Sequence, residues 1–298
     1  MTKRAAIPES EVRLMALIKV NELLRHATEH RYGVAAINVF NYETILWVVR
    51  AAERERAPVI VQFFPGFDRH ISMKYVAYIA TDLARKSEVP IAVHLDHSSA
   101  ADIAVAGVRD GFPSVMVDGS AKPFDENVAM TLEVVKAARV FGVDVEAELG
   151  HVGSGANLND FTDTDLFTKV DDAAAFVELT GCDSLAIAVG NAHGAYKQKP
   201  NLDFQRIAAI RERVDVPLVM HGGSDIPDDQ IRRSVELGIS KFNIATEYDR
   251  AYYNFSKEVY DGSQGRISGF GAIQGIGDKM IGFIASKIRL LNPDGISI

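Results

Sequence analysis

Short apolar runs alternate with longer amphipathic stretches along most of this chain. Each run is apolar at nearly every position instead of every second one, which predicts strands that are buried on both faces. We expect eight such strands, at Val34–Val39, Val59–Phe64, Ile91–Leu95, Ser114–Val117, Val143–Leu149, Leu185–Val189, Leu218–His221 and Ile239–Ile244.

Helix signals separate these strands. Asp171 and Asp172 open a helix that Gly181 closes, and Pro227 and Gly238 lie at the start and the end of another. Strands that alternate with helices are typical of a parallel sheet covered by helices. Eight such units fit a closed (β/α)8 TIM barrel of the α/β class. A doubly wound open sheet is the second candidate.

An N-terminal helix is predicted from about Ser10 to His30, with Gly33 as its stop signal. The evidence is a set of apolar residues near helical spacing. They are Val12, Met15, Ile18, Leu23 and Leu24.

The C-terminal tail, from Gly262 to Ile298, is glycine-rich and then amphipathic around Met280–Leu291. This pattern predicts a terminal helix that packs on the barrel or on another subunit. No stretch with the composition of a linker interrupts the chain. We therefore expect one domain over residues 1–298, with the barrel at about 30–260 and the tail at 262–298.

Composition narrows the classes of protein that the chain can represent. Hydrophobic residues make up 47% of the sequence and charged residues 24%, which is enough apolar material for a sizeable core. The net charge of −8 argues against a general nucleic-acid binder. No apolar run is long enough to cross a bilayer, and the N-terminus lacks the apolar core of a signal peptide. We expect neither a nucleic-acid nor a membrane partner.

Cys182 is the single cysteine, so no intrachain disulfide can form. A chain without disulfides suits a reducing compartment. Together with the missing signal peptide, this predicts a cytoplasmic protein.

The third predicted strand carries the most concentrated chemistry. It runs directly into His94, Asp96 and His97. Because alternate residues of a strand share a face, His94 and Asp96 are expected to project together, and His97 to begin the loop. Imidazoles and a carboxylate at the end of a buried strand indicate a metal site, an acid/base site or both. A hydrogen-bonded pair of structural histidines is the alternative.

Other predicted strands also end in polar residues, where TIM barrels carry their reactive groups. These residues are Asn38, Asn41, Asp118, Glu146, Glu148, Asn191, His193, His221 and Asn243. Four of the eight histidines lie at strand ends. A zinc-type site of His97, His193 and His221 unites them, because three neutral imidazoles leave coordination positions open for a substrate. Each histidine taken singly is better explained by a structural role, and only the three together favour a metal.

A phosphate cradle is predicted after the seventh and eighth strands. Glycine lets backbone N–H groups approach an anion, and the N-terminus of a following helix favours its charge. The residues concerned are Gly222, Gly223, Ser224, Asn243, Ile244, Ala245 and Thr246. Glycines also serve ordinary tight turns, so the adjacent His221 is what makes this pattern informative.

Taken together, these motifs resemble the class II, metal-dependent fructose- and tagatose-bisphosphate aldolase family over roughly residues 10–260. The matching stretches are His94-Leu95-Asp96-His97, Val145-Glu146-Ala147-Glu148-Leu149-Gly150, Ala192-His193-Gly194, His221-Gly222-Gly223-Ser224 and Asn243-Ile244-Ala245-Thr246. They occur in the order and spacing of the family.

The resemblance implies an aldolase that uses Zn²⁺ or another divalent metal to cleave a ketose phosphate reversibly. The products would be dihydroxyacetone phosphate and an aldehyde, formed through a metal-stabilised enediolate. The small-molecule partner is thus a sugar phosphate, and a homodimer or homotetramer is expected.

The same resemblance implies the roles of individual residues. His97, His193 and His221 would bind the metal, and Asp96 would act as acid and base at the C4 hydroxyl of the substrate. Asp118 and Glu148 would form a second shell or an alternative metal position. The substrate-binding residues would be Asn38, Gly194, Gly222–Ser224 and Asn243–Thr246, often with Na⁺ or K⁺ nearby.

Three residues depart from the family pattern. Ala156 stands where a loop glutamate usually handles the C3 proton, Phe64 where many members have Ser or Thr, and Asp225 where glycine is usual. A substrate that is not a bisphosphate is therefore an alternative, such as a deoxy, sulfonated or unphosphorylated ketose. For the missing base we favour Asp160, the nearest carboxylate in a glycine-rich loop, over Asp163 and Asp165.

Two further functions are less favoured. A non-catalytic paralogue would act as a binding or regulatory subunit, but Asp96 and all three candidate metal ligands are intact. A metal-dependent hydrolase on the same barrel is suggested by the histidines alone.

Overall fold

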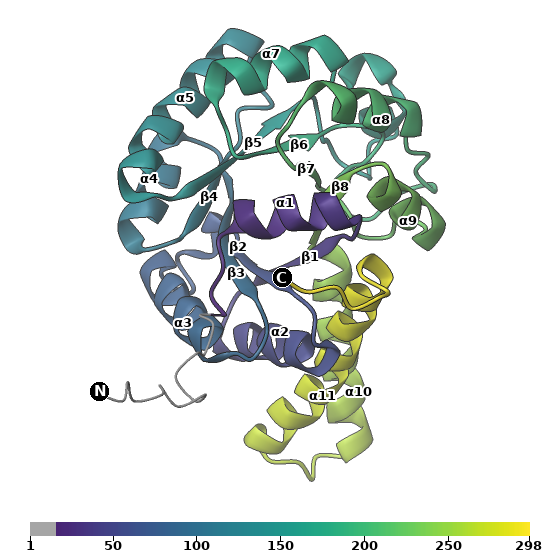
Figure 1. Cartoon of the computed structure of the whole chain (residues 1–298). Helices are drawn as coiled ribbons and strands as arrows, with labels where there is room; N and C mark the ends of the chain where they lie inside the picture. Colours follow the sequence, from purple (N-terminus) through teal and green to yellow (C-terminus); the bar gives the residue numbers. More distant parts are fainter. Residues whose placement is uncertain (1–15) are drawn as a thin grey trace, which may run out of the picture.

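The computed structural model describes residues 16–298, and its strands form a closed parallel barrel in the order β1 to β8. The strands are β1 Val34–Val39, β2 Val59–Phe63, β3 Ile91–Ser98, β4 Ser114–Val117, β5 Asp144–Leu149, β6 Ser184–Ile187, β7 Leu218–Met220 and β8 Ile239–Ile244. Helices ring the barrel, as Figure 1 shows. The predicted TIM barrel is confirmed, and the open sheet is wrong because β1 pairs with β8.

Most helices follow a strand and cover its outer face. The helices are α1 Val20–His30, α2 Tyr42–Glu55, α3 Met73–Lys86, α4 Ala101–Asp110, α5 Phe124–Phe141, α6 Asn159–Thr162, α7 Val170–Thr180, α8 Phe204–Arg213, α9 Asp228–Glu236, α10 Thr246–Ser263 and α11 Gly269–Leu291, with short 3₁₀ turns η2 Pro65–Phe67 and η3 Thr164–Leu166. The predicted stop Gly181 ends α7 in the left-handed conformation. Asn41 caps α2 by accepting a hydrogen bond from Thr44 N, so this strand-end residue has a structural role.

Several predicted strand bounds differ by one to three residues, and the difference at the end of β3 matters most. His97 does not begin a loop but lies inside β3, with φ 45°. The pairing register of β3 with β4 shifts between Leu95 and Ser98, which marks a β-bulge. The bulge keeps His97 on the strand while turning its backbone, a local geometry that apolar patterning does not reveal.

The N-terminal helix begins at Val20, so its predicted start at Ser10 is wrong for residues 16–19. Ile91 N donates a hydrogen bond to Ala16 O at 2.7 Å, and Ile18 N donates to Ile91 O at 3.1 Å. These bonds hold residues 16–18 extended against the start of β3. The predicted helical residues Val12 and Met15 lie outside the described residues.

The barrel interior changes from apolar to polar along the strands. At the N-terminal end, Leu23 and Leu24 of α1 pack on inward-facing residues such as Ala36 and Ile60. Two positions further along β1 and β2, the inward-facing side chains are buried amides. These are Asn38 and Gln62. Helix α1 thus closes the N-terminal, apolar end of the barrel, and the candidate site residues lie towards the C-terminal ends of the strands.

The C-terminal helices α10 and α11 form a hairpin whose far end extends away from the barrel (Figure 1). The predicted terminal helix at Met280–Leu291 is the second half of α11, which packs against α2. A side chain at Gly277 would collide with Trp47 of α2, since a Cβ there would lie 2.5 Å from Trp47 Nε1. Within residues 16–298, no helix has both the length and the hydropathy needed to cross a bilayer.

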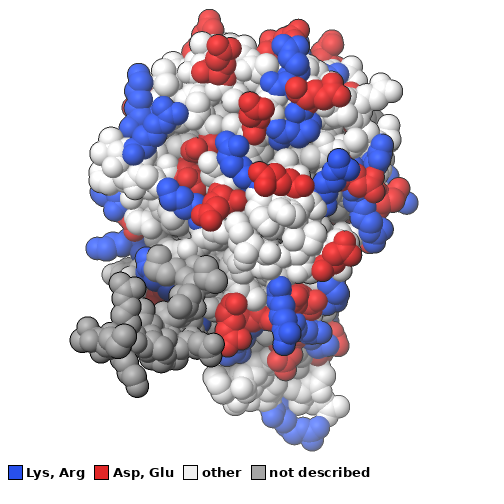
Figure 2. Space-filling model, viewed as in Figure 1, with Lys and Arg blue, Asp and Glu red and all other residues white. Residues whose placement is uncertain are grey.

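Acidic and basic side chains are interspersed on the face of the molecule that carries α1 (Figure 2). The visible part of this face therefore presents no extended region of positive or negative charge. A general nucleic-acid binder would present an extended positive region.

Candidate active site

A cavity of about 220 Å³ lies at the end of the barrel where the strands terminate. It brings together polar residues that are far apart in the sequence. Its lining residues are Asn38, Phe64, Phe67, Asp96, His97, His193, Gly194, Gly222, Ser224, Asn243, Ala245, Thr246 and Asp249. This cavity is the candidate active site.

The three histidines predicted as metal ligands converge at this cavity. The ring centroid of His97 lies 4.9 Å from that of His193 and 4.5 Å from that of His221. One nitrogen of each ring lies within 4.8 Å of one nitrogen of the other two. This spacing suits three ligands of one metal ion.

Two of these rings are oriented by acceptors on their outer side. His97 Nδ1 lies 3.0 Å from Asp118 Oδ2, and His193 Nδ1 lies 3.1 Å from Val152 O. Each contact leaves Nε2 free to face the centre of the cluster. Among residues 16–298, His193 Nε2 is buried and has no hydrogen-bond partner, as expected for an atom that requires a cation.

His221 has the opposite orientation. Its Nε2 lies 2.9 Å from Glu146 Oε1, while its Nδ1 lies 2.9 Å from His97 Nε2 and 3.2 Å from Glu148 Oε2. Buried acceptor atoms therefore lie close to one point, and Glu148 Oε2 also lacks a hydrogen-bond partner within the described part of the chain. A divalent cation at this point would satisfy all of them, so the residues fit the implied metal.

The pKa shifts of His193 and His221 agree with metal binding at this point. Burial lowers the pKa of His193 to about 4 and that of His221 well below its usual value, so both rings stay neutral, as metal binding requires. Burial also acts to lower the pKa of His97, but the charge of Asp96 and the hydrogen bond that His97 donates to Asp118 outweigh it and raise the value to about 9. The carboxylates around His97 therefore favour a positive charge next to this ring.

Asp96 is buried beside the histidines and is held by three side-chain amides. Its Oδ2 accepts hydrogen bonds from Asn38 Nδ2 at 2.9 Å and Gln62 Nε2 at 3.3 Å, and its Oδ1 accepts one from Asn243 Nδ2 at 3.0 Å. Burial alone would raise the pKa of Asp96, but the nearby histidines, led by His97, lower it overall. Asp96 is thus a fixed, ionised carboxylate that can accept a proton.

The predicted phosphate cradle surrounds the N-terminus of α10. Gly222 has φ 61°, and a Cβ there would lie 2.1 Å from Ala192 O, so the position accepts only glycine. Ser224 Oγ lies 3.1 Å from Glu247 N in the first turn of α10. Of the predicted substrate-binding residues, Gly223 and Ile244 do not line the cavity. Gly223 N donates to Asn243 O, and Ile244 packs in the core.

Comparison with known proteins decides between the possible chemistries of this site. Residues 18–295 match the model of the family "Fructose-bisphosphate aldolase class-II". The chain belongs to the class II fructose-bisphosphate aldolase family. The resemblance predicted from the sequence motifs is confirmed.

Solved structures of aldolases share the fold of this chain. The YdjI aldolase from Escherichia coli K12 is 34% identical, with a TM-score of 0.82 over 95% of this chain and 100% of that chain. A protein assigned as a fructose-1,6-biphosphate aldolase from Coccidioides immitis is 29% identical, with a TM-score of 0.82 over 93% and 97%. The fructose-bisphosphate aldolase of Campylobacter jejuni shares the fold at 22% identity, with a TM-score of 0.79 over 93% and 95%.

Phe64 and Asp225, which depart from the pattern of this aldolase family, have different surroundings in the structure. Phe64 lines the cavity and packs edge-on against Phe67, with ring centroids 5.5 Å apart. Asp225 has φ 61° and is paired with Arg250, at 2.9 Å between Oδ2 and the guanidinium. The cavity wall at Phe64 is therefore apolar, and Asp225 is occupied by a partner outside the lining.

Asp160, the predicted C3 base, lies in the loop after β5 and does not line the cavity. Its Oδ2 accepts a hydrogen bond from Ser154 N at 2.7 Å, and its Oδ1 accepts one from Asn157 Nδ2 at 2.5 Å. Asp163 caps η3 by accepting from Asp165 N at 3.1 Å. In this conformation the loop carboxylates organise the loop, so any catalytic role requires the loop to move.

The same loop braces the candidate metal ligand His193 through its backbone. His193 N donates to Gly153 O at 2.8 Å, and Gly155 N donates to His193 O at 2.7 Å. With the contact from Val152 O to the ring, three hydrogen bonds tie the loop to this one ligand.

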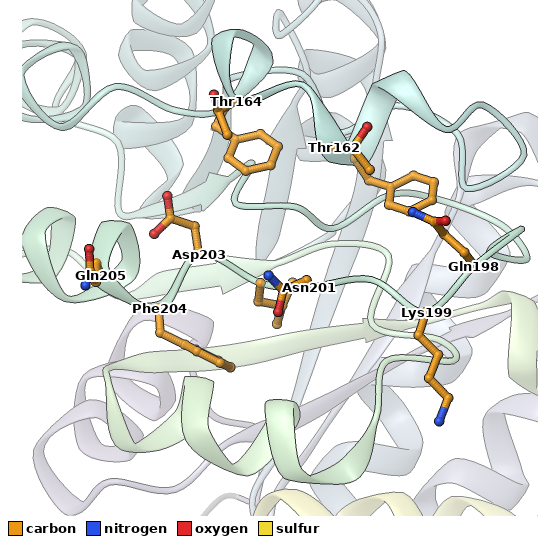
Figure 3. Close-up of a pocket in the computed structure, with 11 residues that line it drawn as sticks. Thr162, Thr164, Gln198, Lys199, Asn201, Asp203, Phe204 and Gln205 are labelled. Carbon is orange, nitrogen blue, oxygen red and sulfur yellow. The ribbon is translucent and has the colours of Figure 1, made fainter.

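A second cavity, of about 510 Å³, lies beside this loop (Figure 3). It is formed by Thr162 and Thr164 on one side and by Gln198, Lys199 and Asp203 on the other. It shares no lining residue with the candidate active site.

Sequence reasoning missed three residues that shape the aldolase site. Gln62 supports Asp96, and Lys241 is fully buried against Glu146. Tyr196 Oη accepts from Ala192 N at 2.8 Å and donates to Gly222 O at 3.0 Å, which joins the segments that carry His193 and His221. Gln62 and Lys241 could have been found as polar residues at inward-facing positions of β2 and β8.

We predict one divalent metal ion per chain at the three histidines. His193→Ala should lower zinc retention to background, because two imidazoles hold zinc far more weakly than three. Elemental analysis of protein purified without chelator is the measurement, and His151→Ala, in the adjacent loop, is the control. Full metal occupancy in a His193→Ala, His221→Ala double variant would contradict the assignment.

Proposed function

We propose that this class II aldolase uses zinc, or another divalent metal, to cleave a phosphorylated ketose reversibly to dihydroxyacetone phosphate and an aldehyde. The observation that carries the proposal is the convergence of three histidine nitrogens beside an ionised carboxylate. Asp96 lies at this point in the same cavity as the phosphate cradle. Membership of the class II aldolase family favours the lyase over a hydrolase.

Individual residues of the chain have separate roles in this reaction. A bound divalent cation supplies a Lewis acid for the carbonyl and neighbouring hydroxyl oxygens of the substrate. Asp96 accepts the proton of the C4 hydroxyl as the C3–C4 bond breaks, and returns it in the condensation direction. Asn38 and Asn243 fix the carboxylate for this transfer. Ser224 and the first turn of α10 hold the phosphate.

The direct test is a screen of ketose mono- and bisphosphates with metal-replete protein, in which released dihydroxyacetone phosphate is measured. Asp96→Asn should lower kcat by roughly 10²–10⁴-fold, the usual contribution of a general base, while zinc content is retained. The asparagine keeps the size of the side chain but cannot accept the proton. Unchanged turnover in Asp96→Asn, or no cleavage of any ketose phosphate by the wild type, would overturn the proposal.

A substrate without a second phosphate is the second candidate, and the cavity lining favours it. Within residues 16–298 the lining contains no lysine or arginine, and Phe64 and Phe67 form part of its wall. Asp249 adds a carboxylate, and burial raises its pKa. A second phosphate dianion would meet neither a cation nor a hydroxyl at Phe64.

We therefore expect weak discrimination between bisphosphates and monophosphates. Phe64→Ser should raise kcat/KM for fructose or tagatose bisphosphate relative to the monophosphate by roughly 10- to 100-fold, because a hydrogen bond to a charged group contributes about 1.5–3 kcal/mol. Phe64→Leu is the matched control, since it removes the ring without adding a donor. A wild-type preference for a bisphosphate by several orders of magnitude would argue against this candidate.

Removal of the C3 proton requires a base, and we propose Asp160 for this role. Asp160 would act once the loop that follows β5 has rearranged. Exchange of solvent deuterium into C3 of dihydroxyacetone phosphate should fall by roughly 10²–10⁴-fold in Asp160→Asn, with metal content unchanged. Ser154→Ala is the control, because it alters the loop but leaves the backbone N–H that binds Asp160. If exchange survives in Asp160→Asn and in an Asp163→Asn, Asp165→Asn double variant, no loop carboxylate is the base.

A further inference from the structure

A buried ion pair lies in the barrel interior next to His221. Lys241 Nζ, from β8, lies 3.0 Å from Oε1 and 2.9 Å from Oε2 of Glu146, from β5. Both side chains are 0% exposed. Such a pair is costly to bury and stabilises a fold less than apolar residues of the same size, so a role other than packing is indicated.

Glu146 is also the acceptor for His221. Glu146 Oε1 lies 2.9 Å from His221 Nε2, and its Oε2 lies 3.5 Å from Ser184 Oγ. A carboxylate paired with a lysine is ionised and has only lone pairs to offer. The hydrogen bond therefore requires that the proton of the His221 ring is on Nε2.

With its proton on Nε2, His221 has its lone pair on Nδ1. This nitrogen lies 2.9 Å from His97 Nε2, at the point where the candidate metal ligands converge. The opposite tautomer would direct an N–H at the metal and remove one ligand from the site.

We propose that Glu146 and Lys241 are positioning residues that hold His221 in its metal-binding tautomer. Glu146 provides the acceptor, and Lys241, which contacts both carboxylate oxygens, fixes the rotation of that acceptor and offsets its charge. This inference rests on the metal centre of the proposed function. It adds the contacts that select one of the two tautomers of His221.

The test compares two variants that both remove the buried charges. Lys241→Met, Glu146→Gln keeps a side-chain oxygen that can accept from His221 Nε2, whereas Lys241→Met, Glu146→Leu has no acceptor at nearly the same volume. Zinc affinity is measured by competition with a chelator. The glutamine variant should bind zinc nearly as tightly as the wild type. The leucine variant should bind it roughly 10–100-fold more weakly, the usual loss when the hydrogen-bond acceptor of a metal-binding histidine is removed.

Equal zinc affinities in the two double variants would overturn the inference, because a purely structural pair would not distinguish an acceptor from an apolar group. Thermal unfolding in chelator verifies that both variants fold. A wild-type protein that binds no zinc would overturn the metal centre itself, which separates the two failures.

A second measurement uses the wild type and so does not depend on the folding of any double variant. Nitrogen-15 NMR of the histidine rings in the zinc-loaded protein reports which nitrogen carries the proton. His221 is assigned in the metal-free protein by the signal lost in His221→Asn, and that signal is followed through a zinc titration of the wild type. A proton on Nε2 of His221 supports the inference, and a proton on Nδ1 overturns it.

Discussion

Most ionisable side chains at the carboxyl ends of the barrel strands are kept out of water by a polar or charged partner. Asp96 is held by three amides, Glu146 by Lys241 and His221, and His97 by Asp118. In a low-dielectric interior an unpaired member of this set would be expensive, so the positions of these residues are mutually determined. The site is therefore a property of the whole ring of strands.

The barrel itself was predictable because its strands are buried on both faces. Apolar runs such as Val34–Val39 and Ile239–Ile244 read as parallel strands, and the structure places them at those bounds. The bulge at His97 was not predictable, because it depends on the pairing register between β3 and β4. The start of α1 was missed because backbone pairing with Ile91 outweighs the apolar periodicity before Val20.

The convergence of His97, His193 and His221 followed from the rule that reactive groups lie at the ends of barrel strands. The supporting residues were harder to find. Gln62 and Lys241 each interrupt an apolar strand with one polar side chain, and only the closed barrel shows that both point at charged partners. Asp160 shows the reverse problem. A carboxylate in a glycine-rich loop suggests chemistry, but its contacts with Ser154 and Asn157 depend on the fold of the loop itself.

The brace between the loop after β5 and His193 has a consequence for how such an enzyme can diversify. Loops of a TIM barrel are commonly regarded as modules that exchange freely while the strands keep the chemistry. Here Gly153 and Gly155 bind the backbone of His193, and Val152 binds its ring. The loop and this candidate ligand are thus parts of one unit. Substitutions at residues 152–155 that reshape specificity are therefore constrained by retention of the proposed metal, and an altered loop has to be inherited or engineered together with the His193 segment.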